Sequence, residues 1–527
     1  MTFRIVASLL AVGAFAFPKD EEIGGLPGFP RLETPQFSGS VDLADGSSAR
    51  YVLVLGPSGF KAVDRPLLLW VGDGRGSSLP GYLSSGVGPW KVGADGALTT
   101  NNVDGWHVTA DLLFWELPAG AGFSTCPAAG CPTYTDTSFE AQSTEFLCEF
   151  FKKFPEFEGS DFFMAGEGLG GVAVPLAALG YADVTCPAPA PKLVGVAVGN
   201  ACTGTEVGPC SPSRAYNTFH QLNEHDFVSP ATVDAVTKYC AGSEGFTQAD
   251  LLCQKAVRAA SAEAGKFNLL DARSRCGQDA TLEKFVCRHT PNATWACISK
   301  DTTPDFSCGR DAALEAYLSR SDVQKALGVA PVDGKAVAWT AAYDEGAYVA
   351  TAADLLLPSA RSYPALIERI GRVMVFAGDG DAATPHSATE QWTRGLGPPP
   401  ASLFYRSRVT SARRKKKLPL LRPFSKSVKS IAESLFASPE PSFDGERVHL
   451  ERRDRRPRTP PPRAGLRVAD AWRPWVVDDF TAGNVVSYDS NFTLVTVRNA
   501  GRHVAESAPR SAAALIRRFI AGHPITL

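Results

Sequence analysis

The chain has 527 residues, of which 44% are hydrophobic and 20% are charged, and its formal net charge is −2. This length and composition allow a large buried core in one or two α/β domains, and they exclude an intrinsically disordered protein. Beyond the N-terminal region, no segment is long and apolar enough to predict a membrane span.

The first sixteen residues have the pattern of a signal peptide. Arg4 precedes an apolar run at 5–15, and the pattern Ala14-Phe15-Ala16 stands two residues before Pro18. A first β-strand or a membrane anchor is the alternative, but the run is too short to cross a bilayer. We therefore favour a signal peptide at 1–16, cleaved after Ala16.

Short apolar runs separated by turn residues predict β-strands. Several are apolar on both faces, as buried parallel strands are. They lie at 51–56, 67–71, 111–116, 161–165, 193–199, 372–377 and 492–497.

Helical patterns lie between these runs. The stretch from Thr137 to Glu140 has the sequence of a capping box and predicts the start of a helix. An apolar stripe predicts another helix from Pro509 to Ala521. Strands that alternate with helices predict a doubly wound, mostly parallel α/β sheet.

Residues 211–320 break this alternation. They are helical in pattern and rich in cysteine, without clear buried strands, so we expect an inserted helical cap over one edge of the sheet. The six cysteines crowded in this region show no repeated C-x-x-C, which weighs against a zinc module and favours disulfides. They are Cys240, Cys253, Cys276, Cys287, Cys297 and Cys308.

The cysteine count also bears on the compartment. Twelve cysteines, an even number, suit disulfides in an oxidising environment. The pairs Cys126–Cys131 and Cys202–Cys210 bracket short loops, and we expect both to form. Asn292-Ala-Thr294 and Asn491-Phe-Thr493 fit the short glycosylation acceptor pattern, which weakly supports secretion.

A basic segment at 402–468 differs from the rest of the chain. Between Arg406 and Arg467 there are eighteen Lys or Arg against six Asp or Glu. The whole chain has 53 basic and 55 acidic residues, so 35 basic and 49 acidic residues lie outside this segment. Such a segment could bind an acidic partner, anionic lipid or nucleic acid, or be cut by a protease. We favour a disordered insert, or intron-derived sequence, because its composition matches nothing around it.

Long ordered motifs identify a family. The chain reads PLLLWVGDGRGSSLPG at 66–81, ADLLFWELPAGAGFS at 110–124, FLCEFFKKFPEFEGSDFFMAGEGLGG at 146–171, KLVGVAVGNACTG at 192–204, SDVQKALGV at 321–329, RVMVFAGDGDAATPHSATEQW at 372–392 and TLVTVRNAGRHVAESAP at 493–509. In order and content these stretches resemble the serine carboxypeptidases, secreted or vacuolar α/β-hydrolases that remove C-terminal residues from peptides.

The resemblance implies an α/β-hydrolase fold with a helical, cysteine-rich cap insertion. We expect the hydrolase core to be split into parts by the cap and by the basic insert. The expected divisions are 17–210 and 321–401 for the first and second parts of the core, 211–320 for the cap, 402–468 for the insert and 469–527 for the C-terminal part of the core.

Three positions correspond to the family's catalytic triad. The nucleophile position is Gly168, which has no side-chain atom that can attack a carbonyl. The acid position is Asp381. The base position is Arg502, whose guanidinium stays protonated near neutral pH. His503, one residue later, is a possible substitute base.

Other positions correspond to the family's binding groups. Gly72 and Gly86 stand where two of three residues that hold the substrate's terminal carboxylate are expected, and only the third, Glu167, is retained. Glu167, if buried, should have a raised pKa or pair with a base such as Arg502. The resemblance places the oxyanion hole at Gly74 and the N–H of Leu169.

These substitutions lead to two hypotheses. The first is an inactive serine carboxypeptidase-like protein of the secretory pathway, extracellular or in a vacuolar or lysosomal lumen, which acts as a binding or scaffold protein. It would hold a peptide or small molecule under the cap and could form a homodimer. The alternative is residual hydrolase activity that uses Asp381, His503 and either a hydroxyl of Ser77 or Ser78 or an activated water.

The glycine-rich turns also resemble nucleotide-binding loops, but neither at 72–76 nor at 166–171 does the spacing fit. We expect no cofactor, no metal and no nucleic-acid partner.

Overall fold

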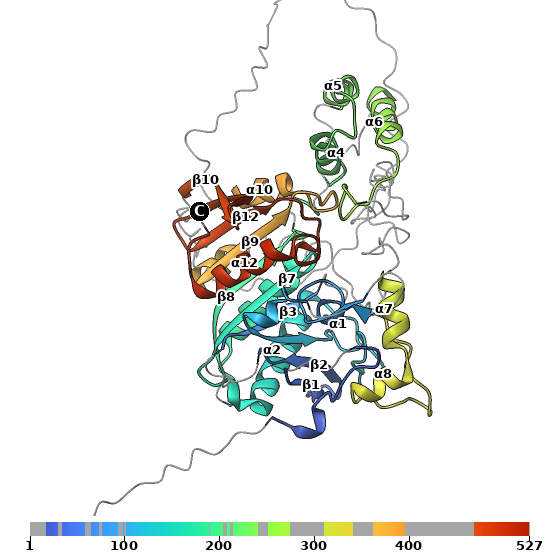
Figure 1. Cartoon of the computed structure of the whole chain (residues 1–527), viewed down its shortest axis with the longest axis vertical. Coiled ribbons are helices and arrows are strands. Elements are labelled where there is room, and N and C mark those ends of the chain that lie inside the picture. Colours follow the sequence, from blue (N-terminus) through green and yellow to red (C-terminus); the bar gives the residue numbers. More distant parts are fainter. Residues whose placement is uncertain are drawn as a thin grey trace, which may run out of the picture. The chain divides into compact units, whose positions relative to one another are not determined.

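A mixed ten-stranded β-sheet organises the chain in the computed structural model (Figure 1). The structure describes residues 17–29, 34–57, 65–72, 76–92, 98–99, 102–188, 190–203, 208–210, 214–240, 251–274, 310–340, 362–394, 396 and 468–525. The predicted signal peptide at 1–16 and residues 402–467 of the predicted basic insert lie outside this part of the chain.

The strands of this sheet follow the order β1-β2-β6-β3-β7-β8-β9-β12-β11-β10. Six consecutive strands, from β6 to β12 in this order, run parallel, and the strands at both edges pair antiparallel. Their bounds are β1 Gln36–Asp42, β2 Ser48–Val54, β3 Leu67–Val71, β6 Asp111–Trp115, β7 Asp161–Glu167, β8 Lys192–Gly199, β9 Arg372–Gly378, β10 Val468–Val477, β11 Phe480–Tyr488 and β12 Phe492–Val497. Two short strands, β4 Lys91–Val92 and β5 Leu98–Thr99, pair separately.

The predicted fold class is confirmed, and so are the seven predicted strands. Each apolar run coincides with one of β2, β3, β6, β7, β8, β9 and β12. The strands that the pattern missed in this sheet are β1, β10 and β11, which form its antiparallel outer parts. Much of β10 is exposed, so its sequence lacks a continuous apolar run.

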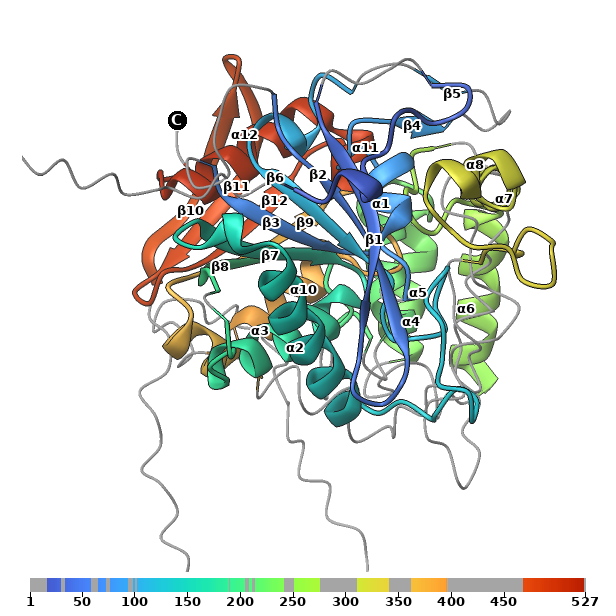
Figure 2. The same cartoon turned by 90° about the horizontal axis from the view of Figure 1, so that it is seen from below.

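Helices cover both faces of the sheet (Figure 2). Along β3, Leu67 and Leu69 pack in the cluster with α2 and α3, whereas Leu68 and Trp70 pack in the cluster with α1 and α12. This alternation follows from the two-residue repeat of a strand. The helices that lie on these faces are α1 Leu79–Leu83, α2 Asp136–Lys153, α3 Gly170–Asp183, α10 His386–Arg394, α11 Val504–Ser507 and α12 Pro509–Ala521.

The predicted helix at Pro509–Ala521 is confirmed as α12, but the predicted start of α2 was wrong. Thr135, not Thr137, is the N-cap residue, and it forms the capping box with Ser138. The Thr135 backbone is extended, with φ −125° and ψ 169°, so its side chain can reach the N–H of Ser138. The prediction rested only on the pattern at Thr137, and the backbone conformation places the cap two residues earlier.

Helices α4 Arg214–Glu224, α5 Pro230–Tyr239 and α6 Leu251–Ala264 share a separate apolar cluster. Two further helices, α7 Arg310–Leu318 and α8 Ser321–Ala326, contribute side chains to the cluster around α1 and α12. Short 3₁₀ turns occur at η1 Lys19–Glu21, η3 Trp106–Val108 and η4 Pro155–Phe157. The proposed boundaries of the cap and of the parts of the core stay predictions.

Four disulfides join the eight cysteines of the described residues. The two predicted local pairs, Cys126–Cys131 and Cys202–Cys210, are confirmed. Cys240 pairs with Cys253. The pair Cys148–Cys186 joins the end of α2 to the loop after α3, across a separation of 38 residues that sequence spacing could not reveal. The other four cysteines lie outside the described residues.

The corrected cap can be tested by mutation. We expect Thr135→Ala to lower the free energy of unfolding by about 1 kcal/mol, because it removes the acceptor for the N–H of Ser138. Thr137→Ala should change it by less than about 0.5 kcal/mol, because Thr137 is exposed. Urea denaturation of both variants makes the comparison, and a larger loss in Thr137→Ala would restore the original assignment.

Candidate functional site

The candidate residues gather where parallel strands end. Gly72 follows β3, Gly168 follows β7, Asp381 follows β9, and Arg502 and His503 follow β12. Because parallel strands present their carboxyl ends at one edge of a sheet, the loops that carry these residues meet there. The topology therefore brings together positions more than 400 residues apart in sequence.

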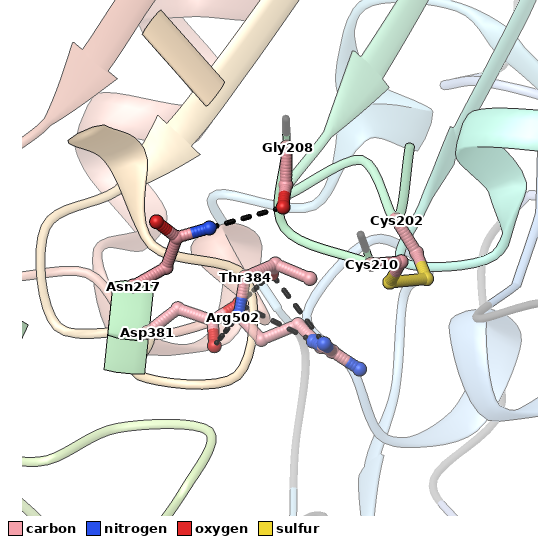
Figure 3. The surroundings of a disulfide bond; sticks show 7 residues. All are labelled: Cys202, Gly208, Cys210, Asn217, Asp381, Thr384 and Arg502. Atoms are coloured by element: carbon pink, nitrogen blue, oxygen red, sulfur yellow. Dashed lines mark hydrogen bonds and ion pairs between the residues drawn. A yellow bond between two sulfur atoms is a disulfide. The ribbon is translucent and has the colours of Figure 1, made fainter. Parts of the chain in front are cut away.

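A tight turn joins β7 to α3 at Gly168. Its φ is +57°, in the left-handed region that glycine adopts without a steric penalty. The Gly168 N–H donates to the carbonyl of Gly199 at 3.1 Å, and its carbonyl accepts from the N–H of Cys202 at 2.7 Å. Cys202 is in turn tied to Cys210 (Figure 3). The strand, turn and helix thus have the order of a nucleophile elbow, with the buried Gly168 at the turn.

Asp381 is fully buried and its carboxylate has several donors. Oδ1 accepts from the N–H groups of Ala383 at 2.7 Å and Thr384 at 3.0 Å. Oδ2 accepts from the Thr384 hydroxyl and lies 3.3 Å from Nε of Arg502. Figure 3 shows Asp381, Thr384 and Arg502 grouped beside the disulfide loop. Asp381 and Arg502, the predicted acid and base positions, therefore lie in contact as an ion pair.

His503 and Glu167 form a second pair. The imidazole Nδ1 of His503 contacts Oε1 of Glu167, and both side chains are almost completely buried. A carboxylate removed from water is destabilised unless it gains hydrogen bonds or an opposite charge, and the imidazole supplies one such partner. We predicted a base such as Arg502 beside Glu167; the base found there is His503, and Arg502 lies against Asp381.

The two hydroxyls considered as substitute nucleophiles are buried and engaged. Ser77 donates to Oε1 of Glu116 at 2.8 Å, and the Ser78 hydroxyl accepts from the N–H of Gly72 at 3.3 Å. Glu116 also accepts from the indole N–H of Trp339 at 2.9 Å. Burial raises the pKa of the Glu116 carboxyl, and these hydrogen bonds oppose the rise. Ser77 thus belongs to the buried network around Glu116.

Both glycines at the expected carboxylate-binding positions are enclosed by backbone. A Cβ on Gly86 would lie 2.4 Å from the carbonyl oxygen of Ala505, in α11, and a Cβ on Gly72 would lie 2.9 Å from that of Ser77. Gly86 also has a φ of +81°. Neither position has room for a longer side chain unless the neighbouring backbone moves.

One half of the expected oxyanion hole can be located. Leu169 is the N-cap residue of α3, directly after the turn. Gly74 lies outside the described residues, so the pairing of the two N–H groups stays a prediction.

The sequence motifs did not single out Thr384 or Glu116. Thr384 comes three residues after Asp381, a spacing at which a hydroxyl and a carboxylate often bond locally, and this signal could have found it. Glu116 follows directly on a strand whose residues are all buried, where a charged group is uncommon.

Within the described residues, no group of three or more His, Cys, Asp or Glu could hold a metal ion. In the same part of the chain, the helices are all too short or too polar to span a membrane.

The sheet order and the strand–turn–helix at Gly168 define an α/β-hydrolase. The family model for serine carboxypeptidases matches residues 27–418 and 462–522. The chain therefore belongs to the serine carboxypeptidase family. The match leaves out 419–461, which lies inside the basic segment predicted as an insert.

Curated plant proteins and a solved yeast structure are similar to the chain. It is 31% identical to serine carboxypeptidase-like 27 of Arabidopsis thaliana over 70% of this chain and 78% of that protein. It is 26% identical to serine carboxypeptidase 24 of the same plant over 99% and 98%. The structure of Kex1(delta)p from Saccharomyces cerevisiae covers 96% of this chain, and the chain covers 97% of it, with a TM-score of 0.59 at 16% identity. That structure supports the fold.

The buried ion pair should be sensitive to removal of its carboxylate. We expect Asp381→Asn to lower the free energy of unfolding by about 3 kcal/mol, because it removes the negative charge that faces the buried guanidinium of Arg502. Asp322→Asn, which breaks a solvent-exposed pair with Arg320, should cost much less. Equal losses in urea denaturation would contradict the role assigned to the Asp381 pair.

The enclosure of Gly86 predicts a second difference. We expect Gly159→Ala to cost about 1 kcal/mol, since its φ is +86° but no atom lies within 4 Å of the added methyl group. Gly86→Ala should cost about 2 kcal/mol more, because the methyl group meets the backbone of α11. Thermal unfolding of the two variants measures the difference, and similar values would mean that α11 yields easily.

Proposed function

We propose that this member of the serine carboxypeptidase family binds a peptide or a small molecule under the cap without hydrolysing it through an acyl-enzyme. The observation that carries the proposal is the combination of Gly168 at the nucleophile position with Arg502 held against Asp381 at the base position. We infer from this combination that the catalytic triad is degenerate.

The chemistry of acyl transfer supports this proposal. The mechanism needs a nucleophilic atom, a base that removes its proton, and an acid that orients the base. Glycine supplies no such atom. The guanidinium of Arg502 stays protonated and cannot accept a proton. Only the acid, Asp381, is retained, and its carboxylate is engaged by Thr384 and Arg502.

Residual activity through His503 and Asp381 is the alternative, and the contacts weigh against it. His503 contacts Glu167 through Nδ1, the nitrogen through which Asp381 would have to orient it. The hydroxyls of Ser77 and Ser78 are buried and hydrogen-bonded elsewhere. Direct attack by an activated water is the remaining way in which the chain could hydrolyse a peptide. The dipeptide assay of the wild type detects this reaction too.

The mode of ligand binding has also changed from that of the family. Family membership implies a peptide substrate, and the yeast relative is described as a prohormone-processing carboxypeptidase. In this chain the glycines at 72 and 86 cannot hold a terminal carboxylate, and backbone fills the space where their side chains would start. We propose that the bound ligand is held by other contacts.

The disulfide bonds indicate the cellular compartment of the protein. The four disulfides and the similarity to the plant proteins suggest the secretory pathway. We propose that the protein resides outside the cell or in a vacuolar or lysosomal lumen. Asn491 is exposed, as its use as a glycosylation site requires. Cleavage after Ala16 and homodimer formation stay predictions.

The proposal is tested with N-blocked dipeptides and three proteins. We expect the wild type to release no product, and Gly168→Ser alone to stay inactive because Arg502 cannot act as its base. The double variant Gly168→Ser, Arg502→His should show measurable turnover, because it restores the nucleophile and a base beside Asp381. Product release is followed by chromatography. Peptide mass spectrometry of residues 160–175 and 495–510 verifies the amino acids at positions 168 and 502 in each protein.

A serine-directed phosphonate gives an independent control. It should label the double variant at residue 168 and leave the wild type unlabelled. Turnover by wild-type protein with Gly168 confirmed would overturn the proposal. Binding of the dipeptides to the wild type, measured by calorimetry, tests the ligand-binding half.

A further inference from the structure

The segment that follows α6, residues 267–274, lies against both loops that carry the acid and base positions. We call it the return segment. The carbonyl of Leu269 accepts from the N–H groups of Ala382 and Ala383, both at 3.0 Å. The carbonyl of Leu270 accepts from the N–H of Arg502 at 2.7 Å. One short stretch of chain therefore holds residues on either side of the Asp381–Arg502 pair.

One side chain of this segment bridges the same two loops. Nη1 of Arg273 lies 2.9 Å from Oδ1 of Asp379, in the loop that carries Asp381. The same nitrogen donates to Oδ1 of Asn499 at 3.3 Å, in the loop that carries Arg502. Nε of Arg273 is 3.2 Å from Asp271, which fixes the orientation of the guanidinium.

The two loops are also joined to each other at the point where Arg273 binds. The N–H of Ala500 donates to Oδ1 of Asp379 at 3.3 Å, and the N–H of Gly380 donates to the carbonyl of Ala500 at 2.8 Å. Oδ1 of Asp379 thus accepts hydrogen bonds both from Arg273 and from the loop that carries Arg502, which we call the base loop; the loop that carries Asp381 is the acid loop. If Arg273 were lost, this carboxylate would keep only the weaker of the two contacts.

The return segment and the two loops are packed too closely for an added methyl group at their glycines. A Cβ on Gly501 would lie 2.6 Å from the carbonyl oxygen of Leu270, and a Cβ on Gly380 would lie 2.5 Å from the guanidinium of Arg273. Helix α4 adds a further link, because the hydroxyl of Thr218 donates to the carbonyl of Ala382 at 2.8 Å. Such close contact means that a shift of the return segment displaces both loops.

We propose that Arg273 is a positioning residue that holds the acid loop and the base loop together, so that the Asp381–Arg502 pair depends on it without touching it. A guanidinium suits this role, since its several N–H groups can bond two acceptors at fixed angles, whereas an ammonium acts as a point charge. The inference concerns the assembly of the site and does not depend on whether the chain hydrolyses its ligand.

The test uses modification of arginine by phenylglyoxal in the full-length protein, followed by peptide mass spectrometry. Arg502 and Arg65 are matched reporters, because each side chain is 11% exposed and paired with a buried aspartate. In the wild type, local opening of the two loops must break the charged hydrogen bonds of Arg273. Arg273→Gln removes those bonds, so the loops should open more often and the modification rate of Arg502 should rise about tenfold. The rate at Arg65 should stay unchanged. Arg273→Lys should give an intermediate rate at Arg502.

Control variants separate positioning from a general loss of stability. Arg320→Gln removes an exposed pair with Asp322 and should leave both reporters unchanged. Asn499→Gly removes only the hydrogen bond from Arg273 to the loop that carries Arg502. It should raise the modification rate of Arg502 by less than Arg273→Gln does. If Arg273→Gln does not fold, Asn499→Gly supplies the test. An unchanged rate at Arg502 in both Arg273→Gln and Asn499→Gly, or an equal rise at Arg65, would overturn the proposal.

Discussion

The need to satisfy the buried carboxylate of Asp381 governs the arrangement of the candidate site. The side chain is 0% exposed, and removing a carboxylate from water costs free energy unless hydrogen bonds and an opposite charge compensate. Two backbone N–H groups, a hydroxyl and a guanidinium surround it. These partners come from the loops after β9 and β12, and the return segment holds both loops in place.

The same constraint explains how the charges at the site are distributed. Arg502 is adjacent to His503 in sequence, yet the two side chains serve different carboxylates. Two of the buried acids have a basic partner, Asp381 with Arg502 and Glu167 with His503. A site with paired charges can remain buried and stable without performing proton transfer. This pairing of charges fits the proposed loss of the catalytic triad.

The framework itself owes little to those residues. The two apolar clusters on the sheet faces and the third among α4, α5 and α6 are built from side chains away from the strand ends. The turn at Gly168 is stabilised by backbone hydrogen bonds from β8 and the loop after it. Substitution at the turn therefore leaves the sheet order and the helix positions unaffected, because their stability comes from apolar burial.

The sequence by itself determined the parallel strands, the helix at Pro509–Ala521 and two local disulfides, and it predicted that Gly168, Asp381 and Arg502 correspond to the family's catalytic positions. Those features have local or periodic signals, such as two-sided apolar runs and short loops between cysteines. Only the tertiary structure decided that His503 contacts Glu167, that backbone closes around Gly86, and that Arg273 bridges two loops. Each of these contacts joins segments distant in sequence, and its geometry depends on how the strand ends converge in the folded sheet. The antiparallel strands β1, β10 and β11 belong with this second group, and β10, which is largely exposed, carries a weaker apolar signal than a buried parallel strand.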